Sequence, residues 1–298
     1  MSATRPLLPQ HERYEFLPLP QRRDYRWPGG KRLAFTVTTN IEWFAFGAGL
    51  GNDPAKAGEP QTHRNYAWRD YGNRVGIWRL FELLDELALP AGHCTNSLVY
   101  QYAPQITDAI RRRGDEVIAH GRSNAENLRG LWQPDEERIL REVTDTIAQH
   151  EGKAAQGWFG AGAYETPHTL DLLKELGYRY VMDWPMDDQP VWLRTRAGPL
   201  LCVPYPIETD DAQSIVHRQY SAELFADMLV DQFDEMLSQS ERHPLVMNVS
   251  VHPYIVGQPF RLRRLRSALA HCVKSGAAWL CRPGEIADHC YCLGECIA

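Results

Sequence analysis

The chain has 298 residues, of which 44% are hydrophobic and 23% charged, a composition that excludes an intrinsically disordered protein. A formal net charge of −6 argues against a nucleic-acid partner, because such partners select basic surfaces. No apolar run approaches the roughly 20 residues of a membrane span, so no membrane partner is expected. The composition fits an enzyme with a small-molecule substrate, although it does not select one.

The N-terminal sequence and the cysteine content predict the compartment. The opening residues, MSATRPLLPQHERYEF, lack the apolar core of a secretory signal. Seven cysteines, an odd number, suggest reduced thiols, so the expected location is the cytoplasm. Three of them, Cys290, Cys292 and Cys296, cluster near the C-terminus. Their spacing lacks the paired CxxC of zinc sites, so free thiols are the expectation and a soft-metal site is the alternative.

Predicted elements alternate between strands and helices after a Pro- and Arg-rich arm at residues 1–30. A Gly-rich loop is expected at 47–68. Apolar, β-branched runs predict strands at 33–39, 91–96, 115–119, 155–159, 178–183, 200–204, 244–251 and 277–280. Apolar residues at helical spacing predict helices at 73–89, 103–113, 134–150, 167–176, 221–239 and 260–275. This alternation predicts one α/β domain at 31–298 with a parallel sheet, either closed into a barrel or doubly wound.

Polar side chains follow several of these strands, at the edge where parallel α/β proteins carry their chemistry. Glu42 comes just after the first strand, beside Trp43 and Phe44. Partial burial there would raise its pKa into the range useful for acid–base catalysis. The alternative is a structural carboxylate paired with an arginine.

Two histidines occupy equivalent places. His120 leaves a strand and precedes a glycine, and His252 ends the most strand-like segment, directly before Pro253. Histidine is the usual acid–base group near neutral pH and a common metal ligand. For each of them, a buried, hydrogen-bonded structural role is the alternative.

Two further clusters are candidates for binding substrate. Asp183 could orient a histidine, and Trp184 could form the wall of a pocket, although such an aromatic residue is more often part of the core. The Gly-rich segment around Trp158, at 157–162, could supply backbone N–H groups to an oxyanion. It is not a phosphate loop, because no Lys-Ser/Thr follows it.

Taken in order over residues 30–290, these clusters resemble the polysaccharide deacetylase (NodB-homology) family. The resemblance implies a distorted (β/α)7 barrel. In that family a metal is held by an Asp and two His, another Asp acts as the base, and a late His acts as the acid. Here Asn40 stands in place of the base and Asn124 in place of the second metal-binding His. Glu42 and His120 keep ligand-type atoms, and His252 matches the late His.

This pattern is more similar to the family branch of metal-independent allantoinases and cyclic-imide hydrolases. The resemblance implies a hydrolase of a small linear or cyclic amide or imide, with Glu42, His120 and His252 as catalytic residues. No cofactor is expected; a zinc ion held by Glu42 and His120 is the alternative. A homo-oligomer, dimer or tetramer, is also implied. The residues expected to bind substrate are Asn40, Trp43, Arg122, Asn124, Trp158, Asp183 and Trp184.

Two other functions stay open at this point. One is a metal-dependent N-deacetylase that acts on an acetylated amino sugar. The other is a non-catalytic small-molecule binding protein on a decayed barrel. A strained ring amide needs less catalytic assistance than an acetamide, which favours the small cyclic substrate once the metal triad is broken.

Overall fold

The computed structural model describes residues 10–47 and 61–294. Parallel strands dominate its sheet, in the spatial order β7-β5-β4-β3-β2-β1-β8, with β6 antiparallel at the edge and the short β9 beside β1. The strands are β1 Leu33–Ile41, β2 Ala91–Thr95, β3 Glu116–Ala119, β4 Gly157–Trp158, β5 Tyr180–Val181, β6 Val191–Leu193, β7 Leu200–Cys202, β8 Leu245–Val251 and β9 Trp279–Leu280.

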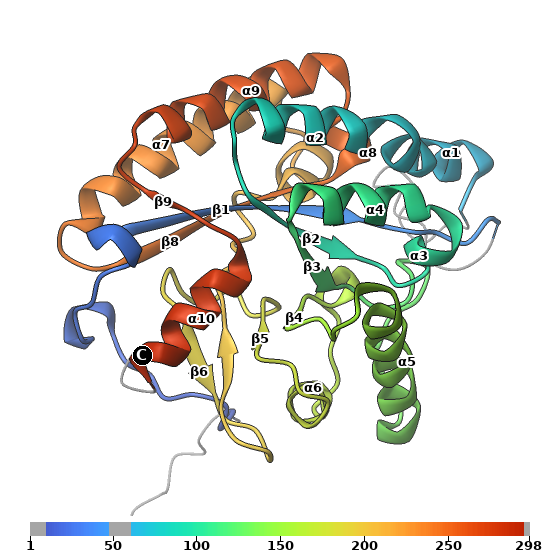
Figure 1. Cartoon of the computed structure of the whole chain (residues 1–298), viewed down its shortest axis with the longest axis horizontal. Coiled ribbons are helices and arrows are strands. Elements are labelled where there is room, and N and C mark those ends of the chain that lie inside the picture. The colour runs from blue at the N-terminus through green and yellow to red at the C-terminus, as the bar shows by residue number, and fades with distance from the viewer. Residues whose placement is uncertain (1–9, 48–60, 295–298) are drawn as a thin grey trace, which may run out of the picture.

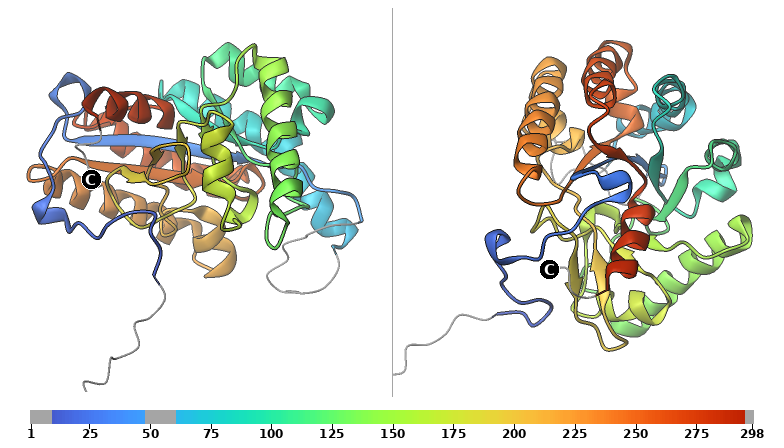
Figure 2. Two further views of the ribbon diagram at one scale, coloured as in Figure 1. Left: turned by 90° about the horizontal axis from the view of Figure 1, so that it is seen from below. Right: turned by 60° about the vertical axis from the view of Figure 1, so that its left-hand side comes forward.

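Helices surround the strands (Figure 1), and the right-hand view of Figure 2 shows the helices outside and the strands inside. The α-helices are α1 His63–Tyr71, α2 Ile77–Glu86, α3 Val99–Tyr102, α4 Pro104–Arg113, α5 Gln133–Glu151, α6 Thr169–Glu175, α7 Ala222–Ser240, α8 Pro253–Val256, α9 Pro259–Lys274 and α10 Pro283–Leu293. The predicted distorted barrel is therefore confirmed, and the doubly wound alternative is wrong.

The distortion lies where β7 and β8 face each other. They do not form a ladder with each other among the described residues; single backbone contacts close the gap instead. Ser250 pairs with Asp210 as an isolated parallel bridge, and its N–H donates to Thr209 O at 3.0 Å. Val246 N–H donates to Asp188 O at 2.9 Å. The segment at 209–211 is thereby held against the C-terminal half of β8.

The first strand shows how the sequence positions the site. All nine residues of β1 are buried, and successive side chains of a strand point to opposite faces. Phe35, Val37 and Ile41 pack in the apolar cluster formed with α2, α7 and α9. Asn40 and Thr38 therefore face the barrel interior, where both hydrogen-bond to side chains of β8.

The predicted 47–68 loop is wrong in its second part, because helix begins already at His63. Thr62 caps α1 by accepting a hydrogen bond from Asn65 N–H at 3.1 Å. A π-helical turn at Gly72–Gly76 then joins α1 to α2. The segment at 63–71 has no apolar period that could have signalled a helix. Residues 48–60 of the predicted loop lie outside the described part of the chain.

The π-helical turn allows two helices to make backbone contact. A Cβ atom placed on Gly76 would lie 2.0 Å from Pro253 O at the start of α8. We expect Gly76→Ala to lower the free energy of unfolding by about 1–3 kcal/mol despite the higher helix propensity of alanine. Chemical denaturation measures this loss. The control Ser238→Ala, at an exposed position of α7, should change stability by less than about 0.5 kcal/mol. Equal stability of the two variants would contradict the close packing.

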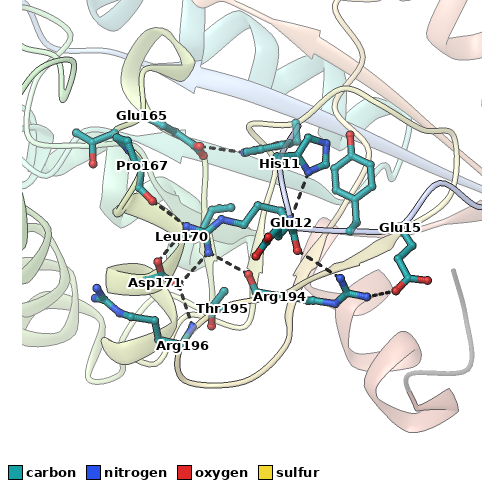
Figure 3. Close-up of a pocket in the computed structure, with 14 residues that line it drawn as sticks. His11, Glu12, Glu15, Glu165, Pro167, Leu170, Asp171, Arg194, Thr195 and Arg196 are labelled. Carbon is teal, nitrogen blue, oxygen red and sulfur yellow. Dashed lines mark hydrogen bonds and ion pairs between the residues drawn. The ribbon is translucent and has the colours of Figure 1, made fainter. Parts of the chain in front are cut away.

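The described part of the arm, residues 10–30, runs along the body of the same chain. Arg13 donates to Asp171 Oδ1 of α6 at 2.9 Å, and its carbonyl accepts a hydrogen bond from Arg194 N at 2.7 Å. These contacts border a cavity of about 930 Å³ between the arm and α6, where Figure 3 labels Asp171 and Arg194. Trp27 is buried and donates through Nε1 to Leu245 O at 3.0 Å. Residues 1–9 lie outside the described part.

Two further expectations concern membranes and metals. Among the described residues, no helix combines the length and apolar character that a bilayer span requires.

In the C-terminal cysteine cluster, Cys290 is buried and Cys292 exposed on α10. Cys296 lies outside the described residues, so the soft-metal alternative stays a hypothesis.

Candidate active site

Glu42, His120 and His252 come together at the C-terminal edge of the sheet, although they are far apart in the sequence. Glu42 Oε1 lies 3.6 Å from His252 Nε2 and 4.0 Å from His120 Nε2. All three side chains are at least about nine-tenths buried. The carboxylate therefore stands between two imidazoles whose Nε2 atoms both face it.

The hydrogen bond at the far side of each ring determines what its Nε2 atom can do. His120 Nδ1 lies 2.6 Å from Phe159 O, which can only accept, so Nδ1 carries a proton. In the neutral ring, Nε2 is then a proton acceptor. It is buried and has no hydrogen-bond partner among the described residues. His120 is thus placed to take a proton from a molecule near Glu42.

His252 forms a pair with Asp211, which follows the closing bridge of the barrel. The distance from His252 Nδ1 to Asp211 Oδ1 is 2.7 Å, and the backbone N–H of His252 donates to the same carboxylate. Although burial opposes the charge, Asp211 and Glu42 raise the pKa of His252 to about 9. Burial raises the pKa of Asp211 to about 6 against the pull of His252. At neutral pH the pair is therefore a carboxylate and an imidazolium that can donate through Nε2.

The predicted rise in the pKa of Glu42 is wrong. Burial does push this pKa upward, but His252, His120 and Arg69 together hold it below the ordinary value. Arg69 Nη1 lies 4.0 Å from Glu42 Oε2, and its guanidinium stacks over Phe44 and Tyr254 at 4.5 and 4.6 Å. Glu42 is therefore a stable anion. Its pairing with Arg69 corresponds to the alternative of a carboxylate paired with an arginine, and a charged Glu42 is compatible with a catalytic role.

Asn124 has its amide nitrogen turned toward Glu42. Asn96 Oδ1 accepts from the backbone N–H groups of Trp43 and Asn124, at 2.7 and 3.1 Å, so its amide nitrogen faces the other way. That nitrogen donates to Asn124 Oδ1 at 2.9 Å. Asn124 Nδ2 must then donate to Glu42 Oε1, at 2.5 Å. Asn124 therefore holds the Glu42 carboxylate in place by donating a hydrogen bond to it.

This arrangement does not fit a catalytic metal ion. A zinc site needs at least three protein ligands, whereas Asn124 offers a donor group where the third ligand would stand. The neighbouring Arg69 and protonated His252 also oppose a cation. Asp210, Asp211 and His252 have ligand atoms within 4.8 Å of one another. However, Asp211 accepts from His252, and Asp210 accepts from Ser250 Oγ at 2.6 Å and Gln213 N at 2.9 Å.

Asn40 lies deeper in the barrel than the catalytic group. Its Nδ2 donates to Tyr205 OH at 3.0 Å and to Ser250 Oγ at 3.1 Å, and it is 1% exposed. Trp43 stacks on Tyr102 with ring centroids 4.9 Å apart. For both residues, the assigned contact with substrate stays a prediction.

Arg122 and Trp158 are engaged elsewhere. Arg122 forms ion pairs with Glu126 and Glu142 on the outside of the barrel, which does not support its predicted role in binding substrate. Trp158 is fully buried and packs edge-on against Tyr178, so it belongs to the core.

Asp183 and Trp184 line a cavity of about 440 Å³ at the end of β5. Beside Glu42 itself there is a cavity of only about 10 Å³, lined in part by Arg69 and Tyr66, which is room for about one water molecule. In the predicted oxyanion loop, the N–H groups of Phe159 and Gly160 already donate to Ala119 O and Asp183 Oδ1, so these two are not available.

Sequence reasoning missed Arg69, Asn96 and Asp211. Arg69 lies between the predicted loop at 47–68 and the predicted helix at 73–89, in a segment assigned to neither, and Asp211 follows a short connection without a periodic pattern. Asn96 does carry a signal, because it is a polar residue at the C-terminal end of a predicted strand, as Asn40 and His120 are.

Comparison with known proteins agrees with this fold, although no family model matches the chain. A Schizosaccharomyces pombe protein named "Putative polysaccharide deacetylase" is 25% identical over 278 residues, which covers 87% of this chain and 86% of that protein. The crystal structure of the PuuE allantoinase matches with a TM-score of 0.81 at 23% identity, covering 94% of this chain and 95% of that one. A "probable polysaccharide deacetylase" of Pseudomonas aeruginosa PAO1 gives 0.79 at 23% identity, with 94% and 96% covered.

A more distant match has a TM-score of 0.52 at 14% identity, over 89% of this chain and 68% of the other. That protein, from Bacillus anthracis, is described as a pseudoenzyme of the CE4 family. The chain is therefore similar in sequence to a protein named as a polysaccharide deacetylase, and its fold is the NodB-type barrel of the two solved structures that match it over nearly their full length.

Proposed function

We propose that the protein is a hydrolase that cleaves the C–N bond of a small linear or cyclic amide or imide without a metal ion. The observation that carries this proposal is the placement of the Glu42 carboxylate between a proton-accepting and a proton-donating imidazole. The names of the relatives, which include an allantoinase and polysaccharide deacetylases, support C–N hydrolysis as the reaction class.

The geometry suits one water molecule as the nucleophile. Two acceptors that lie 4.0 Å apart, Glu42 Oε1 and His120 Nε2, can each accept a hydrogen bond of about 2.8 Å from the same water. The angle at that water is then about 90°, near its own bond angle. Glu42 would orient the water, and His120 would take its proton because a neutral imidazole is the stronger base.

His252 would complete the reaction by donating its proton. Breaking an amide bond requires protonation of the leaving nitrogen, and the imidazolium held by Asp211 carries the proton toward Glu42 and the reacting centre. In a cyclic substrate the leaving nitrogen stays attached to the product. Ring opening requires that one proton is removed from the attacking water and that one is delivered to this nitrogen. The acceptor His120 and the donor His252 provide these two functions.

Neither alternative function is favoured by a specific observation. A metal-dependent N-deacetylase would need a third ligand where Asn124 presents its N–H group. A non-catalytic binding protein on the same fold would bind a ligand at these histidines and release it unchanged, which the screen described next detects. A homo-oligomer stays part of the proposal, with size-exclusion chromatography and light scattering as its measurement.

The direct test is a substrate screen with chelator-treated protein. Allantoin, hydantoin, succinimide and an N-acetyl amino sugar are incubated with the protein after dialysis against EDTA, and products are followed by mass spectrometry. We expect hydrolysis of at least one cyclic amide or imide at an unchanged rate after chelation. Activity restored only by added Zn²⁺, Ni²⁺ or Co²⁺ would overturn the metal-free proposal, and a ligand returned unchanged would support the binding protein.

The pH profile tests the assignment of the acid. Because the pKa of His252 is raised to about 9, its protonated form persists below that pH and is lost above it. We expect kcat/KM to fall as the pH rises through about 9. In Asp211→Asn this fall should begin at lower pH, because the Asp211 charge contributes to the raised pKa. An alkaline limb that is the same in both proteins would remove His252 from the acid role.

A further inference from the structure

A cavity of about 530 Å³ lies between the first turns of α7 and α9, in the outer layer of the barrel. The two helices pack side by side (Figure 1). The wall of the cavity combines aromatic and apolar surface with arginines, from Ile215, Tyr220, Phe260, Arg261, Arg263 and Arg264. Among the described residues that line it, Glu223 is the only acidic one. The mechanism proposed above uses none of these residues.

Two of the three arginines have no carboxylate partner. Arg264 Nη2 lies 3.1 Å from Glu223 Oε1, whereas Arg261 and Arg263 form no ion pair with any described residue. Arg261 is half-buried, and its guanidinium stands over the Phe260 ring at 5.2 Å. Its side chain makes one long hydrogen bond, from Nη1 to Ile255 O at 3.4 Å. Burial lowers the pKa of Arg261, which the more distant charge of Asp211 only partly opposes.

The position of these arginines in α9 is unfavourable for the helix itself. The N-terminus of a helix carries a partial positive charge, which favours acidic residues in the first turn and disfavours basic ones. The first turn of α9 contains no acidic residue, and Arg261 lies in it, followed by Arg263 and Arg264. Helix stability alone therefore does not explain the three arginines. An anion bound between them would offset their mutual repulsion and their interaction with the helix dipole.

Both walls of the cavity continue from the proposed catalytic pair. The segment after Asp211 forms the π-helical turn Ala212–His217 and leads to Tyr220. The segment after His252 leads through α8 to Phe260. Gln219, next to Tyr220, has a φ of +58°, in the left-handed region that costs a non-glycine residue free energy. Such backbone and π-helical turns often mark functional sites, and a molecule in the cavity would contact both segments.

We propose that this cavity binds a small phosphate monoester whose organic part is a flat apolar ring. The charges match, because two arginines lack a carboxylate and a phosphate monoester carries a charge of about −2 at neutral pH. Guanidinium groups also bind phosphate oxygens through paired hydrogen bonds.

The size and the lining of the cavity favour an organic ester over inorganic phosphate. A volume of about 530 Å³ is in the range of small-molecule sites and exceeds what a lone phosphate ion would fill. Phe260, which is 64% exposed, and Tyr220 offer ring surface beside the arginines. Binding at this site requires no turnover, so the inference goes beyond the proposed hydrolysis and does not depend on it.

The test is a binding measurement with phenyl phosphate, the simplest ester of this kind, and with its two parts, phenol and inorganic phosphate. Ligand-observed NMR titrations of the full-length protein give the dissociation constants. We expect phenyl phosphate to bind about tenfold more tightly than either part. Arg261→Gln and Arg263→Gln should each weaken its binding about tenfold, because each removes charge-assisted hydrogen bonds to phosphate. Glu223→Gln should strengthen binding, because it releases Arg264 from its ion pair.

The matched control is Lys274→Gln, which removes one positive charge from an exposed position in the last turn of the same helix and should leave the affinity unchanged. The unfolding midpoint of each variant shows whether the fold is kept. If Arg261→Gln does not fold, the exposed Arg263→Gln and the expected gain in Glu223→Gln still decide the outcome. Equal affinity for phenyl phosphate in all these variants would overturn the site, and so would phenol that binds as tightly as the ester. Inorganic phosphate with the affinity of phenyl phosphate would overturn the assignment of a ring.

Discussion

Replacing His252 by asparagine is expected to lower kcat by about 10²- to 10⁴-fold, the usual contribution of a positioned general acid. Asparagine can still donate a hydrogen bond to Asp211 from nearly the position of Nδ1, so the buried Asp211 carboxylate keeps a hydrogen-bond donor. What it cannot do is carry a proton at the position of Nε2. Steady-state kinetics on the substrate found in the screen measures the loss.

Circular dichroism and the unfolding midpoint show whether this variant keeps its fold. A matched control is His271→Asn, because His271 is also paired with an aspartate, Asp234, but lies exposed on α9. That control should retain full activity. A His252→Asn protein with the same kcat as the control would refute the role of His252.

Replacing Glu42 by glutamine is expected to reduce kcat by about 10²- to 10³-fold and to move the alkaline limb of the pH profile to lower pH. Glutamine can still accept the hydrogen bond from Asn124, but it has no charge to orient water or to stabilise a protonated His120. The shift in the limb follows because the Glu42 charge contributes to the raised pKa of His252.

The pH profile separates this electrostatic role from a merely structural one. Glu82→Gln, at an exposed position of α2, is the control and should change neither kcat nor the profile. A Glu42→Gln enzyme that is slow but keeps its alkaline limb near pH 9 would show that the carboxylate acts on the water alone. An enzyme with normal kcat would exclude Glu42 from catalysis.

Much of this site could be predicted because strand ends are readable in the sequence. Glu42, His120 and His252 each follow a short apolar run, and parallel strands bring such positions to one edge. The charge state of Glu42 could not be predicted in the same way. It depends on Arg69, whose helix has no apolar period, and on the proximity of two histidines that are distant in sequence.

Contacts among side chains were equally inaccessible to sequence reasoning. The positions of Arg122 beside His120 and of Trp158 in a glycine run predict contact with substrate, yet Arg122 lies on the outside of the barrel and Trp158 in the core. The short β6 and the helix α10 were missed, since an antiparallel edge strand of three residues and a Cys-rich helix carry weak periodic signals.

The arm has a consequence for how the molecule behaves in solution. An edge strand such as β6 leaves backbone groups that can pair with another chain and begin aggregation. Arg13 O accepts from Arg194 N, directly after β6, so the arm occupies part of that edge. A chain shortened to start at residue 31 would expose this backbone and also the pocket that holds Trp27. We expect it to lose solubility even with every active-site residue in place.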